Sequence, residues 1–146
     1  ESLYLQVRAG FAGHSRLAIG QFFAAEPNLK KALLKFYTAA LDEYFMDTLP
    51  LSCIMCCTAT VEAIVHPKVR RDMKALLDEI VHVLAKKFQQ AQQDGQYPPD
   101  ADKKLAAKTT QAVLHCLALR PRAGESRTSL NKMATHAVEI LCAAAL

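Results

Sequence analysis

Residues 67–95, PKVRRDMKALLDEIVHVLAKKFQQAQQDG, decide the fold of this chain. Their apolar side chains recur every three or four positions, which places them on one stripe of an α-helix. They are Val69, Met73, Leu76, Leu77, Ile80, Val83, Leu84, Phe88 and Ala91. Pro67 suits the first turn, where its missing N–H costs nothing, and Gly95 suits the left-handed position just past the last turn. We expect one helix of about 40 Å at ~1.5 Å per residue, with shorter helices packed along it.

The composition is that of an ordinary globular protein, because 51% of the 146 residues are hydrophobic and 22% are charged. Glycine is scarce, proline falls at segment edges, and no run alternates polar and apolar residues as a half-buried strand does. We therefore expect an all-α fold and a single domain over residues 1–146. The net charge of +4 comes from basic residues spread over several helices, which favours solvated helix faces over a nucleic-acid-binding face.

The sequence also predicts the compartment of the protein. No apolar run reaches the ~18 residues that cross a bilayer, and the start of the chain has no signal-peptide pattern. Five cysteines, an odd number partly placed in apolar runs, favour reduced thiols over a disulfide framework. We expect a cytoplasmic protein without a membrane partner. Because Glu1 opens an expected helix without a capping residue, we also expect that a further segment precedes it.

Around the long helix, about five further helices are expected from apolar spacing and from the breaks between segments. Their ranges are Glu1–Phe23 with a break near Gly10, Leu29–Phe45, Ser52–Val65, Ala101–Leu119 and Ser126–Leu146. Asp100 or Asp102 can cap the helix before Pro121, and Glu26-Pro27-Asn28 starts the second helix. The segment Ser52–Val65 contains a single charged residue, Glu62, so it predicts a helix buried on all sides.

A buried Glu62 must be paired or protonated, and two interpretations stay open. The first is an ion pair with a basic residue at the start of the long helix: Lys68, Arg70 or Arg71. The second is a polar anchor in the wall of an apolar ligand cavity. In that case Thr58, one turn earlier, and Met55, two turns earlier, share its helix face.

Aromatic residues of the second helix offer further candidates for a cavity. Phe36, Tyr37, Tyr44 and Phe45 form an aromatic face at helical spacing, which is more typical of a core than of a ligand site. Tyr37 and Tyr44 are the better candidates for ligand contact, because each hydroxyl needs a hydrogen-bond partner. Phe88 of the long helix can complete the lining, with core packing again as the alternative.

Three cysteines, Cys53, Cys56 and Cys57, form the most conspicuous local motif. A redox CxxC follows a strand, and none is expected here. A zinc site needs further ligands, and the five histidines are scattered. Small fillers of a buried helix explain the cysteines best, with a structural or metal-binding helical bundle as the alternative function. No nucleophile elbow, phosphate-binding glycine loop or Glu-x-x-His pair is present, so we expect neither an enzyme nor a cofactor.

The order of the motifs resembles the C-terminal domain of tetracycline repressor (TetR) family transcriptional regulators. The resemblance rests on the buried segment Cys53–Glu62 (CIMCCTATVE), the pair His66–Pro67, the turn Asp94–Asp102 (DGQYPPDAD) and the turn Arg122–Leu130 (RAGESRTSL). Residues 1–7, ESLYLQV, resemble the segment just after the recognition helix of the family. Each motif alone is weak, and the resemblance depends on their order and spacing over nearly the whole chain.

The resemblance implies a domain that binds a small-molecule effector, here small and largely apolar, in a cavity among its earlier helices. It implies a homodimer formed by the last two helices, and operator DNA bound by an N-terminal helix-turn-helix module that this chain lacks. Binding of the effector would control DNA binding allosterically. The expected ligand-binding residues are Tyr37, Tyr44, Met55, Thr58, Glu62 and Phe88. The expected dimer contacts, read from the apolar stripes of the last two helices, are Leu105, Val113, Leu117, Leu130, Met133, Ala137 and Leu141.

Overall fold

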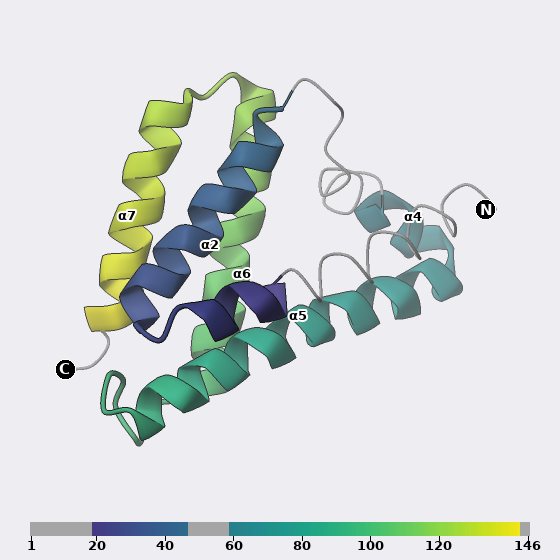
Figure 1. Cartoon of the computed structure of the whole chain (residues 1–146). Coiled ribbons are helices and arrows are strands. Elements are labelled where there is room, and N and C mark those ends of the chain that lie inside the picture. The colour runs from purple at the N-terminus through teal and green to yellow at the C-terminus, as the bar shows by residue number, and fades with distance from the viewer. Residues whose placement is uncertain (1–18, 47–58, 144–146) are drawn as a thin grey trace.

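The computed structural model describes residues 19–46 and 59–143, and within these ranges every regular element is helical. The prediction of an all-α fold is therefore confirmed. Residues 19–25 are helical and lead into the labelled helices of Figure 1. These are α2 (Leu29–Tyr44), α4 (Thr60–Val65), α5 (Pro67–Gln93), α6 (Lys103–Leu119), the 3-10 helix η2 (Arg120–Ala123) and α7 (Arg127–Ala143).

The long helix α5 begins at Pro67 and ends at Gln93, as its sequence predicts. Gly95 follows in a left-handed conformation, with φ of 70°. Its N–H donates to the carbonyl of Gln92 at 3.2 Å, and the N–H of Gln96 reaches back to the carbonyl of Ala91 at 2.8 Å. This is the Schellman arrangement, which satisfies the last carbonyls of a helix and requires positive φ at the position occupied by Gly95.

Two predicted helix starts are also confirmed by their hydrogen bonds. The Asn28 side chain accepts from the backbone N–H of Lys31 at 2.9 Å, which caps α2. Asp102, rather than Asp100, caps α6, because its Oδ1 accepts from the backbone N–H groups of Lys104 and Leu105, both at 2.9 Å. Both caps satisfy N–H groups that a helix leaves without an internal partner.

Helices α2, α6 and α7 pack against one another, and α5 crosses at one end of this group (Figure 1). The main contact of α5 is with α6, whereas that of α7 is with α2. The core therefore lies between the three helices and the C-terminal half of α5. Its fully buried large side chains include Leu33, Tyr37, Leu41, Leu84, Phe88, Leu117, Leu130 and Val138.

The expectation that Ser52–Val65 is a buried helix is wrong for the part that the structure describes. In α4, Val61 is 62% exposed, Ile64 is 72% exposed and Val65 is 67% exposed, while Ala63 is buried. The physical reason is the position of α4 at the end of α5 away from α7 (Figure 1), where its main contact among the described helices is with α5. Within the described residues, α5 covers one face of α4, and Val61, Ile64 and Val65 stay exposed.

Candidate functional site

The structure places the predicted ligand-binding residues in different environments. Tyr37 and Phe88 are fully buried in the core, and Tyr44 is half-buried against it. The Tyr37 hydroxyl donates to the backbone carbonyl of Thr110 at 2.9 Å, so its partner is a neighbouring helix of the same chain. Burial raises the pKa of Tyr37 well above its usual value, which keeps the phenol protonated. The packing interpretation therefore accounts for Tyr37 and Phe88.

Both interpretations of Glu62, as a buried ion pair and as a polar anchor in a cavity wall, assumed that its side chain is buried, and the structure contradicts that burial. Glu62 is exposed on α4, and its carboxylate lies 3.3 Å from Nε2 of His66 instead of pairing with a basic residue of α5. Arg70 donates to the backbone carbonyls of Ala63 and Ile64, each at 3.0 Å, and so holds the end of α4. The structure does not bring Glu62 together with Tyr37 and Phe88, because α4 lies at the other end of α5 (Figure 1).

The remaining cavity residues, Met55 and Thr58, lie outside the described residues. Among the earlier helices expected to surround the cavity, residues 1–18 of the segment Glu1–Phe23 and residues 52–58 of the segment Ser52–Val65 also lie outside them. The cavity among the earlier helices therefore stays a prediction.

The predicted dimer contacts divide into two groups. Leu117, Leu130 and Leu141 are buried in the core of one chain, so another chain cannot reach them without opening that core. Their burial does not support their assignment as dimer contacts, which stays a prediction. Val113, Met133 and Ala137 are half-buried, and Leu105 alone among the seven is largely exposed, at 61%. The burial of the three leucines has a simple cause, since the apolar stripe of an amphipathic helix first fills the core of its own chain.

A second stripe on α6 faces away from the core, and the sequence analysis, which predicted Leu105 as a dimer contact, did not separate this stripe from the core stripe of the same helix. It consists of Leu105, Thr109, Ala112, Cys116 and Leu119, and we call it the outer stripe. Its members follow one another at alternate steps of four and three residues, the spacing of the contact positions in coiled coils. None of them is charged. The spacing was the signal that could have identified this stripe beside the core stripe of α6.

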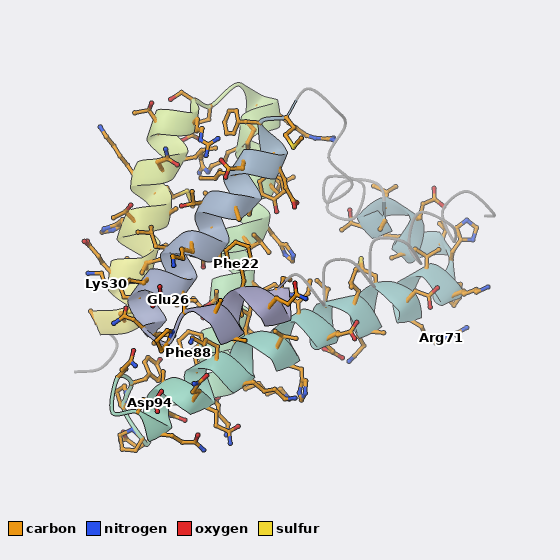
Figure 2. The ribbon with its side chains drawn as sticks, viewed as in Figure 1. Phe22, Glu26, Lys30, Arg71, Phe88 and Asp94 are labelled. Atoms are coloured by element: carbon orange, nitrogen blue, oxygen red, sulfur yellow. The ribbon has the colours of Figure 1, made fainter. Side chains whose placement is uncertain are left out.

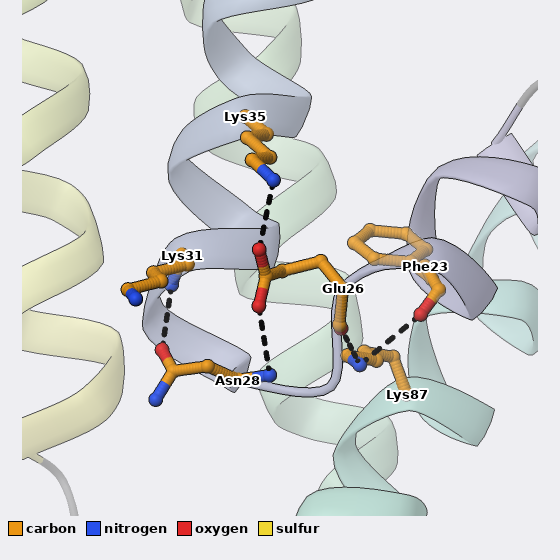
Figure 3. Close-up of polar contacts among 6 residues, drawn as sticks. All are labelled: Phe23, Glu26, Asn28, Lys31, Lys35 and Lys87. Atoms are coloured by element: carbon orange, nitrogen blue, oxygen red, sulfur yellow. Dashed lines mark hydrogen bonds and ion pairs between the residues drawn. The ribbon is translucent and has the colours of Figure 1, made fainter.

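A second feature that the sequence reasoning missed lies where the helix 19–25 turns into α2. Lys87 of α5 is only 3% exposed, and its ammonium group donates to the backbone carbonyls of Phe23 at 3.2 Å and Glu26 at 2.5 Å (Figure 3). The Phe23 carbonyl lies in the last turn of the helix 19–25 and the Glu26 carbonyl lies just past it, so the ammonium group caps that helix. Burial lowers the pKa of Lys87 from its usual value. A lysine between Leu84, Phe88 and Ala91 on the core stripe was the sequence signal for this contact.

The same turn is held from two other sides. Oε1 of Glu26 accepts from the backbone N–H of Asn28 at 3.2 Å, and Oε2 accepts from the Lys35 ammonium group at 2.8 Å (Figure 3). The hydrogen bond from Lys35 is the main reason that the pKa of Glu26 lies below its usual value. Gln96, in the turn after α5, accepts from the Leu29 N–H at 2.8 Å and donates to the Pro27 carbonyl at 3.2 Å.

We call this group, Glu26, Asn28, Lys35, Lys87 and Gln96, the junction. It ties the turn 26–28 to α2, to α5 and to the turn that follows α5. Phe23 adds apolar contact, because its ring packs against that of Phe36 with centroids 5.4 Å apart. The junction therefore fixes the direction in which the helix 19–25 leaves the body of the protein.

The alternative of a metal-binding bundle depended on Cys53, Cys56 and Cys57, which lie outside the described residues. Within residues 19–46 and 59–143, no three histidine, cysteine or carboxylate side chains gather as metal ligands would. Cys116 and Cys142 are free thiols in this part of the chain. Among the described helices, none is both long enough and apolar enough to cross a membrane.

Comparisons with known proteins give no independent assignment. Nothing matched this chain in a scan of protein-family models, among curated proteins or among solved structures.

Proposed function

We propose that this chain is the effector-binding and dimerisation domain of a TetR-like transcriptional regulator, which acts in the cytoplasm as a homodimer. The outer stripe of α6 is the observation that carries the proposal. Leu105 is 61% exposed and Leu119 is 47% exposed, at the two ends of a stripe without a charged residue. A contiguous uncharged and partly apolar helix face of this kind marks a surface that another protein covers.

A second copy of the same helix is a suitable partner for the outer stripe. In a two-fold contact the same patch faces itself, and the five side chains of the stripe carry no charge of their own. The nearest charge is the Arg120 guanidinium, which donates to Cys116 Sγ at 3.2 Å toward one end of the stripe. The small side chains of Ala112 and Cys116 in its middle let two helix axes approach toward the lower end of the ~8–10 Å range. Ile140 of α7 is 57% exposed and offers additional apolar area on the neighbouring helix.

The junction supports the regulatory part of the proposal. In the family, the DNA-binding module precedes the segment to which the helix 19–25 corresponds. A change in the position of α5 relative to α2 would move this helix through Lys87 and Gln96, and would thus change the spacing of two DNA-binding modules in a dimer. An effector produces that change only if it binds one arrangement more tightly than the other.

The dimer is tested by sedimentation equilibrium of Ala112→Glu, which places a charge in the middle of the outer stripe. The proposal expects a dimer for the unaltered chain and a monomer for this variant, because two buried like charges would face each other across the two-fold axis. Lys104→Glu, an exposed position outside the stripe, is the matched control and should remain dimeric. A monomeric unaltered chain would contradict the proposed dimer.

The regulatory function is tested with the chain joined to an N-terminal helix-turn-helix module. Operator affinity is measured with and without a panel of small apolar compounds. The expected result is that at least one compound changes the dissociation constant about tenfold, or ~1.4 kcal/mol. If no compound changes it, while the fusion dimerises and binds DNA, the sensor function is rejected.

A further inference from the structure

A shallow groove of about 480 Å³ runs along the outer face of α2. The groove is lined by Phe22, Lys31, Leu34, Lys35, Thr38, Ala39 and Asp42. Six of these residues belong to the side of α2 that faces away from the buried Leu33 and Tyr37. Phe22, labelled in Figure 2, comes from the helix 19–25. The groove therefore spans the two helices that the junction connects.

The groove combines an apolar floor with an uneven distribution of charge. Phe22 is 38% exposed and Leu34 is 37% exposed, so the ring of Phe22 and the methyl groups of Leu34 are available for contact. Lys31 and Lys35 lie at the end near the junction, where Glu26 is the carboxylate that faces them. At the other end, Asp42 pairs with Arg127 of α7. The net charge is thus positive at the junction end and balanced at the opposite end.

We propose that this groove binds a free amphipathic carboxylate, a carboxylic acid anion with a long alkyl chain. The carboxylate would accept charge-assisted hydrogen bonds from Lys31 and Lys35, and the alkyl chain would cover Phe22, Leu34 and Ala39. The inference rests on the proposed function in one respect, because it names the chemical class of the effector.

Binding at this groove is coupled to the junction through Lys35. The Lys35 ammonium group already donates to Oε2 of Glu26, so a ligand carboxylate at the same group competes with Glu26. Glu26 also accepts from the Asn28 N–H through its carboxylate and from Lys87 through its backbone carbonyl. Ligand binding therefore weakens one of the contacts that orient the helix 19–25. By linkage, a junction that lacks the Glu26 carboxylate binds the ligand more tightly.

Isothermal titration of the 146-residue chain with dodecanoate, below its micelle concentration, tests the site. Dodecyltrimethylammonium is the probe of opposite charge, and acetate is the probe without an alkyl chain. Saturable binding of dodecanoate is expected, with much weaker binding of the other two. Equal binding of the cationic detergent overturns the assignment of the anion, and the lack of dodecanoate binding overturns the site.

Substitutions then locate the binding. Lys31→Gln should weaken dodecanoate binding by about two- to fivefold, the size of one exposed ionic contact. Leu34→Asp should abolish it by placing a carboxylate beside the alkyl chain. Lys30→Gln is the matched control, since Lys30 is exposed on the same helix, lies near Cys142 of α7 and does not line the groove. Equal effects of Lys30→Gln and Lys31→Gln would overturn the site.

The competition with Glu26 has its own test. Glu26→Gln should bind dodecanoate about two- to fivefold more tightly, because Lys35 loses its competing partner. In the unaltered chain, dodecanoate should speed hydrogen exchange at the Asn28 amide. Unchanged or weaker binding by Glu26→Gln overturns the coupling.

These results separate the site from the proposed function. A chain that dimerises through α6 and regulates operator binding but does not bind dodecanoate rejects the groove alone. A chain that binds dodecanoate at the groove, but does not change operator affinity in the fusion, rejects the sensor function alone.

Discussion

The two ends of α5 differ in how their apolar neighbours are covered. Near the C-terminal end, α5 packs against α6 and α2, and the core residues Leu84 and Phe88 are fully buried. At the N-terminal end its main partner is the six-residue helix α4, on which Val61 and Ile64 are largely exposed. Figure 2 shows Phe88 beside the lower end of α2, and Arg71 near the opposite end of α5.

Among the described residues, burial follows the number of neighbouring helices and not the apolar content of a segment. Segment 59–65 is at least as apolar as the C-terminal half of α5, yet a charged group of α5 is buried while valine and isoleucine of α4 are exposed. Lys87 tolerates burial because two backbone carbonyls accept its hydrogen bonds. The exposed apolar side chains of α4, by contrast, have no polar group that needs a hydrogen-bond partner.

The largest expected effect distinguishes these two ends directly. Leu84→Ala should destabilise the protein by about 2–5 kcal/mol, because it leaves a cavity in the core. Ile64→Ala, at a position that is 72% exposed, should change the free energy of unfolding by no more than about 0.5 kcal/mol. Urea unfolding of both variants, followed by circular dichroism, measures the two values. Similar losses would show that α4 is covered in solution and would contradict the difference in burial between the two ends of α5.

The next effect compares two lysines of α5. Lys87→Met keeps the volume of the side chain but removes the donor to the Phe23 and Glu26 carbonyls, so a loss of about 1–3 kcal/mol is expected. Lys74→Met removes an exposed ion pair with Asp78 and should have an effect within about 0.5 kcal/mol. Amide hydrogen exchange should also become faster in residues 19–25 of the Lys87 variant alone. An equal loss in both variants would mean that the cap on helix 19–25 contributes nothing.

The helices themselves could be predicted from sequence, because their signals are local. Pro67 and Gly95 mark the ends of α5, and Asn28 and Asp102 cap α2 and α6, each through contacts within a few residues. The burial of a helix face depends instead on elements that are distant in sequence. The exposure of α4 and the core positions of Leu117 and Leu130 could not be deduced from spacing, since an apolar stripe looks the same whether it meets its own chain or another.

The candidate sites show the same division. The contacts that tie the turn 26–28 to Lys87 and Gln96 join residues 61 to 69 positions apart, and nothing in the sequence pairs these residues. A lysine on the core stripe of α5 indicated only that an acceptor must lie nearby. The outer stripe of α6 was detectable through its spacing, but it lies beside the core stripe of the same helix, and both stripes carry two leucines among smaller side chains.

A smaller effect concerns the turn at the buried end of α5. Gly95→Ala should cost about 1 kcal/mol, because φ of 70° is unfavourable for a residue with a side chain even where open space surrounds it. Gly20→Ala, inside helix 19–25 and also in open space, should instead stabilise the protein by about 0.4–1 kcal/mol. Thermal unfolding of the two variants should therefore show shifts of opposite sign. Two shifts of the same sign would contradict the left-handed end of α5.

The smallest effect is the pH dependence of Glu26 at the junction. Lys35 and the Asn28 N–H hold the pKa of Glu26 below 4.5, so the folded state binds its proton less readily than the unfolded state. The stabilisation is therefore complete above about pH 4.5 and is lost as the pH falls through the lower folded pKa. Glu26→Gln should unfold at a slightly lower temperature than the unaltered chain at pH 7, and the difference should shrink toward zero in acid. A difference between the two proteins that is as large in acid as at pH 7 would contradict the constraint of Glu26 by Lys35 and Asn28.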